Sequence, residues 1–458
     1  MENGIAAPAT GKVGKRVWLS FILVGLIGQL AWAIENQYIN LFVYSQSGDA
    51  NHINWMTTAS SVVATLTTFF VGAFSDRIGK RKPIIAIGYC IWGVTVFLFG
   101  LMSLSDMMAL SGGDMVKAIV LVGVMNTLVD CVMTFFGSSA NDACFSAFVT
   151  DHTDSKSRPF VESVISVLPL LAMAMMLLLG MALGLPGSQD DMSQQEFADS
   201  VATPWLIFFL ICGALTTAVG IASFFLLPKD QIKPNRESNY LVNLVDGFRP
   251  KTIKANPMFY VCLLVFLFFN VAVDSFMPYY MVYFQENLGF GGLQFYAAMG
   301  VIIGVASIAV IALGAFMERI GKMKFLLPSI LAMGVGAVCL YFSANAYFAV
   351  FAGTVLMAGY LLGTAAIGAR LRDETPADKV GSLQGVRMIM AVMLPMVIGS
   401  NLSTLSFQSE YVNEYGQIAA KPDRNMFLVT IGACAIALLA AVALLLLDKR
   451  RKSKGIQG

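Results

Sequence analysis

Charged residues are scarce in this chain of 458 residues. Asp, Glu, Lys and Arg make up 13% of the sequence, whereas hydrophobic residues make up 57%. So few charged side chains cannot cover the surface of a water-soluble globule of this length. The composition therefore excludes a soluble protein and predicts an integral membrane protein.

Histidine is rarer still. The two histidines, His52 and His152, have no acidic or thiol partners at the spacing of metal ligands, and the sequence has no nucleophile elbow, phosphate loop or zinc motif. The seven cysteines all fall inside apolar stretches, so their spacing indicates neither a disulfide framework nor a metal site. We therefore expect no enzyme, no metal ion and no cofactor.

A basic surface is also missing. The net charge is +2, and the Lys and Arg residues lie in short loops and tails without forming a face that could follow a phosphate backbone. Nucleic acid is therefore excluded as a partner, and the lipid bilayer and a small solute remain.

Long apolar runs are abundant, and each is about 20 residues long or slightly more, the length that crosses a bilayer as a helix. The first run is too long for the core of a signal peptide and lacks a small-residue cleavage pattern, so we expect it to be kept as a membrane helix. The sequence predicts an all-α membrane protein with twelve transmembrane helices. The runs are 17–44, 53–74, 84–104, 116–138, 160–185, 204–227, 258–284, 291–316, 325–343, 347–368, 386–405 and 425–447.

The basic residues predict the orientation of these helices. With the amino terminus inside, 27 of the 30 Lys and Arg residues fall on the inner side, and only Lys117, Lys421 and Arg424 fall outside. This bias is typical of cytoplasmic loops. We expect both termini to be cytoplasmic in a multi-pass protein of the cell (inner) membrane. The predicted parts are a tail at 1–16, a bundle at 17–227, a polar linker at 228–257, a bundle at 258–447 and a basic tail at 448–458.

One inner loop occurs twice. Residues 72–82 and 314–324 are identical at eight of eleven positions, and each copy lies between two apolar runs. A weaker match pairs Asp151 and Thr153 with Asp373 and Thr375. A repeat of about half the chain length predicts two pseudo-symmetric six-helix bundles, the usual construction of secondary transporters.

The first copy carries Gly72, Asp76, Arg77 and Gly79, followed by a basic cluster, and it resembles the loop signature of the major facilitator superfamily. The stretch from Asn141-Asp142-Ala143 through Thr150-Asp151, with Arg158 after it, is similar to the loop after the fourth span of glycoside-pentoside-hexuronide symporters and of sucrose-transporter-like proteins. This resemblance implies cation-coupled uptake of a sugar or glycoside by alternating access, at a site between the halves near the middle of the membrane.

The second span departs from that family pattern. In melibiose-permease-like members, acidic residues of this span help to form a sodium site, but here no Asp or Glu occurs between Trp55 and Ser75. We therefore expect coupling to protons rather than to sodium.

Three carboxylates lie deep within predicted spans: Glu35, Asp130 and Asp274. A charge at such a depth costs at least about 2.5–3.5 kcal/mol, so it usually faces a partner or a water-filled path. The alternative is a hydrogen bond or ion pair that only holds helices together. We expect Asp130 to be the main proton carrier, with Glu35 as its rival, because protonation removes a buried charge.

Polar and aromatic side chains accompany these carboxylates. On the first span they fall within an arc of roughly 140°, and a ring beside amides and carboxylates is typical of a sugar site. On the fourth and seventh spans the spacing of four residues places them on one helix face, although bundle packing through amides is an alternative. The candidate substrate-binding residues are Gln29, Trp32, Glu35, Asn36, Asn126, Asp130, Asn270 and Asp274.

The repeated loops are candidates for gating. The resemblance implies a network of charges that closes the inner side, although the basic residues could serve only to fix the topology. The candidate gating residues are Asp76, Arg77, Arg158, Glu162, Glu318 and Arg319.

We therefore expect a proton-coupled sugar or glycoside symporter with one chain as the functional unit. An exporter of drugs or metabolites, or an importer of another small polar solute such as a nucleoside, would use the same fold. A sensor or scaffold without transport is the alternative from a different class.

Overall fold

The computed structural model describes residues 13–154, 157–187, 192–230, 247–321, 323–376, 380–407, 410–413 and 415–453. Within these residues, twelve helices are long and apolar enough to cross a membrane, and each coincides with one predicted span. The prediction of an all-α membrane fold is confirmed. The spans are Lys15–Ser47, Ala50–Ile78, Lys82–Phe99, Met115–Asp151, Phe160–Ala182, Gln194–Leu226, Pro257–Glu286, Gly292–Leu313, Met323–Tyr341, Ala346–Asp373, Leu383–Ser406 and Met426–Arg451.

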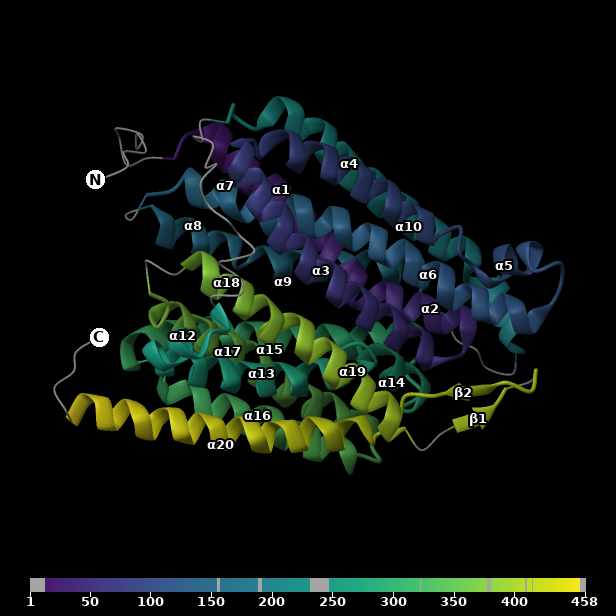
Figure 1. Ribbon diagram of the computed structural model, residues 1–458. Helices are drawn as coiled ribbons and strands as arrows, with labels where there is room; N and C mark the ends of the chain where they lie inside the picture. Colours follow the sequence, from purple (N-terminus) through teal and green to yellow (C-terminus); the bar gives the residue numbers. More distant parts are fainter. Residues whose placement is uncertain are drawn as a thin grey trace. The chain divides into compact units, whose positions relative to one another are not determined.

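Contacts divide the chain into two compact units. The first comprises Met1–Ser47 and Leu66–Ser238, and the second comprises Gly48–Thr65 and Asn239–Gly458. The elements from the first half of the sequence run from purple to teal in Figure 1. They are α1 (Lys15–Ala33), η1 (Ile34–Ile39), α2 (Asn40–Ser47), α3 (Ala50–Ile78), α4 (Lys82–Phe99), α5 (Leu104–Leu110), α6 (Met115–Gly137), η2 (Ser138–Phe145), α7 (Ser146–Asp151), α8 (Arg158–Ile165), α9 (Leu168–Ala182) and α10 (Gln194–Leu226).

The core of the first unit is aromatic. Helix α4 packs along α10, and α1 packs against α9 and α10. Trp205 and Phe209 of α10 are buried and stack with their ring centroids 5.6 Å apart, while Phe42 of α2 meets Trp205 edge to face at 5.5 Å. Such large rings bury much apolar area and prefer these geometries. They hold α2 and α10 together.

The elements from the second half run from teal to yellow in Figure 1. Helix α13 packs against α17, α19 and α20, and α16 packs against α17 and α20. The elements are α12 (Pro250–Ala255), α13 (Pro257–Phe276), α14 (Tyr280–Glu286), α15 (Gly292–Ile320), α16 (Met323–Tyr341), α17 (Ala346–Asp373), α18 (Val380–Met388), η4 (Ile389–Met393), α19 (Leu394–Ser406), β1 (Glu410–Val412), β2 (Ile418–Ala420) and α20 (Met426–Ser453).

A small β-hairpin interrupts the helical pattern of the second unit. Strands β1 and β2 pair antiparallel, with Tyr411 opposite Ala419. The hydroxyl of Tyr411 donates to the carbonyl of Gly48 at 2.7 Å, and the backbone N–H of Ala420 donates to Asp49 Oδ1 at 2.9 Å. These bonds tie the hairpin to the turn that precedes α3. The sequence analysis did not predict the hairpin.

The fourth span is longer than predicted, and this corrects the placement of the stretch after it. The helix continues from α6 through the π-helical η2 and α7 to Asp151. Asn141 and Asp142, which we had placed in a loop, therefore lie inside a membrane helix. The prediction stopped at 138 because Ser138, Ser139 and the residues after them lower the hydropathy. Residues 231–246 of the predicted linker, 1–12 of the first tail and 454–458 of the last tail lie outside the described residues.

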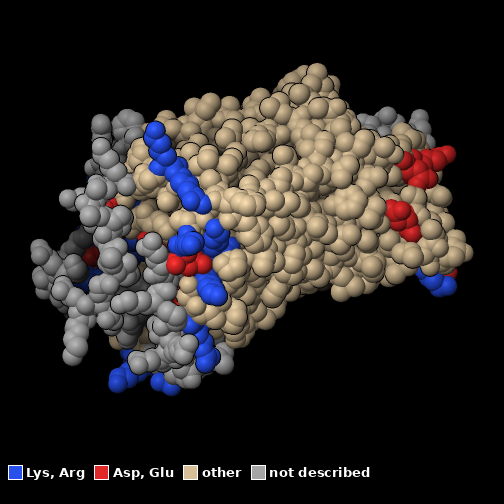
Figure 2. Space-filling view, turned by 90° about the horizontal axis from the view of Figure 1, so that it is seen from above, with Lys and Arg blue, Asp and Glu red and all other residues tan. Residues whose placement is uncertain are grey.

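Charged side chains gather toward the ends of the molecule on the face drawn in Figure 2. Lys and Arg collect mainly at one end, Asp and Glu stand out at the other, and a wide band without charge lies between them. Large apolar side chains such as Phe225 and Leu439 are exposed on these helices. An uncharged band of exposed apolar residues is what lipid contact requires.

Candidate transport site

A pair of acidic residues lies buried in the first unit. Glu35 is 9% exposed and Asp130 is 1% exposed. The hydroxyl of Thr134 donates to Glu35 Oε1 at 2.9 Å, and the Asp130 carboxylate interacts electrostatically with Glu35. Within the described part of the chain, Glu35 Oε2 has no hydrogen-bond partner. Two acidic groups so close inside a membrane protein are costly when both are charged.

Local structure explains how Glu35 reaches this place. It lies in η1, a π-helical stretch of six residues between α1 and α2. A π-helix widens the turn and rotates the side chains relative to an α-helix, and such stretches are frequent at functional sites. On α6, the spacing of four residues places Asn126, Asp130 and Thr134 on one buried face, as that spacing predicts.

The side-chain amide of Asn126 donates to two backbone carbonyls of the first unit. Its Nδ2 donates to the carbonyl of Val122 at 2.8 Å and to that of Met102 at 3.3 Å. Asn126 is fully buried. It therefore joins α6 to the chain after α4 through backbone carbonyls.

A third carboxylate, Asp142, belongs to the same cluster, and the sequence analysis missed it as a site residue. Asp142 interacts electrostatically with Glu35. Its Oδ2 accepts from Ser138 Oγ at 3.3 Å, and its Oδ1 accepts from Asn141 Nδ2 at 3.1 Å. The signal was present in the sequence, because the four-residue spacing that joins Asn126, Asp130 and Thr134 continues through Ser138 to Asp142.

Trp32, on the polar side of the first span, packs against Trp92. The rings of Trp32 and Trp92 have centroids 5.0 Å apart with their planes inclined by 57°. Trp32 and Gln29 are half-buried, whereas Asn36 is exposed and donates to the carbonyl of Trp32 at 2.8 Å. The structure thus brings Trp32, Glu35, Asp130 and Asp142 together in one unit.

In the second unit, Asn270 and Asp274 lie one turn apart on α13. Nδ2 of Asn270 donates to the carbonyl of Ala391 in the π-helical η4 at 2.6 Å. Asp274 is half-buried and interacts electrostatically with Tyr360 of α17. Asn270 therefore joins α13 to the π-helical stretch, and Asp274 is a carboxylate inside a membrane-spanning helix of this unit.

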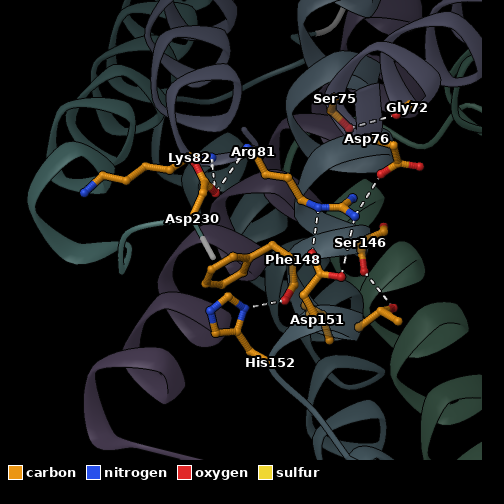
Figure 3. A network of polar contacts seen from close by, with 12 residues as sticks. Gly72, Ser75, Asp76, Arg81, Lys82, Ser146, Phe148, Asp151, His152 and Asp230 are labelled. Atoms are coloured by element: carbon orange, nitrogen blue, oxygen red, sulfur yellow. Dashed lines mark hydrogen bonds and ion pairs between the residues drawn. The ribbon is translucent and has the colours of Figure 1, made fainter. Parts of the chain in front are cut away.

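A charge network surrounds the end of the first repeated loop, and Figure 3 shows its members. Nη2 of Arg81 lies 2.9 Å from Asp76 Oδ1, and Nε of Arg81 lies 2.7 Å from Asp151 Oδ2. Arg81 is 7% exposed. One buried guanidinium thus joins α3 to the end of α7.

The same network fixes the beginning of α4. Asp230 Oδ1 accepts from the backbone N–H groups of Arg81 at 3.1 Å and Lys82 at 3.2 Å (Figure 3). Lys82 Nζ donates to the carbonyl of Leu227 at 2.8 Å. A carboxylate at a helix N-terminus satisfies free N–H groups and complements the helix dipole. The segment after α10 is therefore bound to α4.

The other predicted gating residues lie apart from this network. Arg77 and Glu162 are exposed. Arg158 donates from Nη2 to the carbonyl of Thr150 at 3.0 Å, so it caps the end of α7. Glu318 and Arg319 belong to α15, and their side chains lie outside the described residues. The partner of Asp76 is Arg81, which the sequence analysis had considered only as a topology determinant.

The second unit uses different charges near the end of α17. Nη2 of Arg370 lies 2.6 Å from Glu374 and 2.8 Å from Asp448, and Nη1 of Arg451 lies 3.2 Å from Glu374. These ion pairs join α17 to α20. In the second copy of the repeated loop, Met323 takes the place of Arg81.

Among the described residues, twelve apolar spans with carboxylates buried inside them are typical of a multi-pass membrane transporter. The sequence matches the family described as Major Facilitator Superfamily over residues 10–400. The chain therefore belongs to the major facilitator superfamily, and it is a secondary transporter of small solutes rather than an enzyme.

Individual relatives are distant. The chain is 23% identical over 343 residues to Multidrug resistance protein 1 of Bacillus subtilis (strain 168), covering 74% of each chain. Its fold is similar to that of the nucleoside transporter NupG, with a TM-score of 0.66, 12% identity and coverage of 94% and 98%. It is also similar to the xylose transporter XylE from E. coli, with a TM-score of 0.63, 11% identity and coverage of 93% and 96%. At such identities the structural likeness shows the fold alone.

Proposed function

We propose that this protein is a proton-coupled symporter that imports a sugar or glycoside by alternating access. The observation that carries the proposal is the buried pair of Glu35 and Asp130, with Thr134 donating to one of them and Trp32 on the neighbouring turn. Burying two ionisable side chains inside a membrane helix bundle costs free energy, and ionisable residues in such positions usually have a function. An aromatic ring beside it offers a surface for the C–H face of a sugar.

Asp130 is the proposed main proton carrier, and Glu35 is its rival. The groups that face them are Thr134, Asp142 and the thiol of Cys131. Because two neighbouring carboxylates repel each other, a proton taken up by either one removes a buried charge and lowers the cost of closing the site. Proton binding therefore favours the closed, solute-bound state.

The proposed solute site takes its residues from both halves of the sequence. The resemblance to sugar symporters supports a sugar or glycoside, and a xylose transporter among the structural relatives is compatible with that class. The relatives also include a nucleoside transporter and a multidrug resistance protein. The uptake test therefore includes a nucleoside and a lipophilic cation beside the sugars. The proposed binding residues are Gln29, Trp32, Glu35, Asn36, Asn126, Asp130, Asn270 and Asp274.

Gating is assigned to the charged residues around the repeated loops. Arg81, held between Asp76 and Asp151, supports this assignment because separating those helices would break two ion pairs at once. Its second-half counterparts are proposed from the repeat in the sequence. The proposed gating residues are Asp76, Arg77, Arg81, Arg158, Glu162, Glu318 and Arg319.

The proposed setting is the cell (inner) membrane, with both termini cytoplasmic and one chain as the functional unit. The distribution of Lys and Arg supports this orientation. The proposed bundles comprise 17–227 and 258–447, with a cytoplasmic linker at 228–257 between them.

The test is uptake by purified protein in liposomes under an imposed pH gradient. The panel consists of monosaccharides, disaccharides, a nucleoside and a lipophilic cation. We expect a sugar to accumulate and the accumulation to vanish when a protonophore removes the gradient. Uptake of the nucleoside alone, or dependence on sodium instead of protons, would overturn the assignment.

The variant Asp130→Asn separates coupling from binding, because it keeps the shape and polarity of the side chain and removes its titration. We expect accumulation driven by the pH gradient to fall at least about tenfold, the effect of removing an essential acid or base. Exchange of labelled for unlabelled solute should continue, because it needs no net proton movement. Normal accumulation by Asp130→Asn would transfer the carrier role to Glu35, to be tested by Glu35→Gln.

A further inference from the structure

The first half of α3 is grouped apart from its neighbours in the sequence. Residues Gly48–Thr65 belong to the second compact unit, whereas the chain before them, up to Ser47, and the chain after them, from Leu66 on, belong to the first unit. Helix α3 is nevertheless continuous over Ala50–Ile78. A movement of the first unit against the second must therefore either detach Gly48–Thr65 from the second unit or bend α3.

The β-hairpin fastens the start of this segment, and we call strands β1 and β2 the strap. The hydroxyl of Tyr411 donates to the carbonyl of Gly48 at 2.7 Å, and the N–H of Ala420 donates to Asp49 Oδ1 at 2.9 Å. The same oxygen of Asp49 accepts from the backbone N–H of Asn51 at 2.9 Å. Asp49 therefore binds the strap and the first turn of α3 at once.

The ends of the strap are fastened to another helix. Lys421, which directly follows β2, has its Nζ 3.2 Å from Glu286 Oε2. Phe407, which precedes β1, meets Tyr279 edge to face with ring centroids 5.2 Å apart. Glu286 and Tyr279 both belong to the span Pro257–Glu286 of the second unit. The strap thus has one set of contacts with α3 and another set with its own half of the chain.

The strap has little stability of its own. Each of its strands has three residues, and the opposed side chains of Val412 and Ile418 are each 68% exposed. An isolated two-stranded hairpin is at best marginally stable in water. The position of the strap therefore depends on the two sets of contacts, and the loss of a few hydrogen bonds is enough to free it from α3.

We propose that the strap holds the first half of α3 on the second unit and releases Gly48 and Asp49 each time the solute site opens to the outside. The inference rests on the proposed function, because it assumes alternating access and the proposed orientation. The contacts of Lys421 and Phe407 keep the strap on the second unit after release, so it can bind α3 again. A hairpin that only stabilised the fold would keep its bonds to α3 throughout the cycle.

A cysteine at position 61 detects the release of α3 without any solute. Asn54, Thr58 and Ser61 have the spacing of one helix face. Asn54 and Thr58 of this face bind Asn401 of α19. Ser61 is buried, and its hydroxyl donates to the carbonyl of Thr58 within the same helix. In a protein whose native cysteines are replaced, Ser61→Cys should become accessible to outer water when this face separates from α19.

The first test compares two tyrosines. We expect Tyr411→Phe, which removes one bond of the strap, to raise the rate at which a membrane-impermeant thiosulfonate labels Ser61→Cys on intact cells roughly two- to tenfold, the weight of one hydrogen bond. The matched control is Tyr347→Phe at the start of α17, where the side chain is 88% exposed, and it should leave the rate unchanged. An unchanged rate in a correctly folded Tyr411→Phe protein, or equal increases in both variants, would overturn the proposal.

The second test closes the strap with a covalent bridge. A short bifunctional thiol reagent that a reductant cleaves joins Asp49→Cys to Ala420→Cys. Compared with the same protein before bridging, we expect uptake of the solute found in the liposome panel to be abolished and to return after reduction. The control joins Glu286→Cys to Lys421→Cys, which ties the same strap to its own unit and should leave uptake unchanged. A bridge between positions 49 and 420 that does not form, or that leaves uptake intact, would contradict the release of the strap.

The proposed function and the strap fail in different ways. If the wild-type protein takes up no member of the panel, the proposed function fails, whereas the labelling of Ser61→Cys still decides whether the strap holds α3. If a sugar accumulates but the labelling ignores Tyr411→Phe, the proposed function stands and the strap is only a structural hairpin.

Discussion

At the scale of single residues, Arg81 and Arg77 show how similar side chains in one loop differ in their consequences. Arg81 is buried between the carboxylates of Asp76 and Asp151, whereas Arg77 is exposed. Removing one partner from a buried ion pair leaves the remaining charge uncompensated, but an exposed charge is screened by water. The two arginines therefore form a matched pair for mutation.

We predict that Arg81→Met lowers the free energy of unfolding by about 1–3 kcal/mol. The value lies below the 3–5 kcal/mol of a fully buried pair because Asp76 and Asp151 are 40% and 25% exposed. Met is the natural choice because Met323 occupies this place in the second copy of the loop. Thermal unfolding in detergent measures the change.

The control is Arg77→Met, which should change stability by less than about 0.5 kcal/mol, as exposed substitutions usually do. Equal effects of the two substitutions would mean that the buried ion pairs contribute nothing beyond the charge of the loop.

The sequence could not distinguish Arg77 from Arg81, for a physical reason. Gly79 has a φ of 67°, and its N–H donates to the carbonyl of Ser75 at 2.9 Å, which ends α3 in a tight turn. This left-handed conformation suits glycine. The turn reverses the chain and brings Arg81 back to Asp76, five residues earlier, and spacing along a helix gives no indication of such a return.

At the scale of secondary-structure elements, Asp230 links the end of one helix to the beginning of another. We predict that Asp230→Ala lowers the free energy of unfolding by about 1 kcal/mol, the usual value of an N-terminal helix cap. The reason is that the N–H groups of Arg81 and Lys82 lose their acceptor. Thermal unfolding in detergent is again the measurement.

The matched control for this cap is Asp230→Asn, which keeps an acceptor oxygen and removes the charge. It should lose only the smaller electrostatic part, a few tenths of a kcal/mol. If Asn proves as damaging as Ala, the effect comes from the charge and not from capping.

Helices α3 and α19 are joined by a pair of amides in the second unit. Nδ2 of Asn54 donates to Asn401 Oδ1 at 3.0 Å, Nδ2 of Asn401 donates to Thr58 Oγ1 at 3.0 Å, and Ser400 Oγ donates to Asn54 Oδ1 at 2.8 Å. Side-chain hydrogen bonds between membrane helices are worth about 0.6–1.7 kcal/mol. We predict a coupling energy in that range for the cycle of Asn54→Ala, Asn401→Ala and the double variant.

The measurement is thermal unfolding of the four proteins of this cycle. Ser61→Ala serves as a control, because Ser61 donates to the carbonyl of Thr58 within its own helix. A coupling energy of zero would show that the two asparagines contribute independently.

The helices themselves were largely predictable, and their irregularities were not. Twelve apolar runs predict twelve spans because lipid permits few other backbone structures. The π-helical stretches that hold Glu35, Asp142 and Ala391 leave no such signature, since one extra residue in a turn hardly changes the local hydropathy. Asp142 was therefore assigned to a loop, although it lies in the π-helical η2 and accepts hydrogen bonds from Ser138 and Asn141. The hairpin at 410–420 depends on contacts with Gly48 and Asp49, which lie far away in the sequence.

At the scale of the whole molecule, the two copies of the repeated loop are alike in sequence and unlike in their charges. The first unit uses Arg81 between two carboxylates, whereas the second has Met323 at that position and places Arg370 and Arg451 around Glu374. The two halves therefore share the sequence of this loop, but different ion pairs join the helices of each half. Gating by the two halves is accordingly expected to differ in its response to mutation.

The orientation of the whole chain leads to a prediction that tests the distribution of charge directly. Ala109 is exposed on α5, which follows the third span, and Ser453 is exposed at the end of α20. With the seven native cysteines replaced, we expect Ala109→Cys to react with a membrane-impermeant maleimide on intact cells. Ser453→Cys should react only after the membrane is opened, because the basic end of α20 is retained on the cytoplasmic side. Labelling of both positions from the same side would contradict the odd number of spans between them. If instead Ser453→Cys reacts on intact cells and Ala109→Cys does not, the Arg81 network lies on the outer side. It could then not have the proposed role of closing the cytoplasmic entrance.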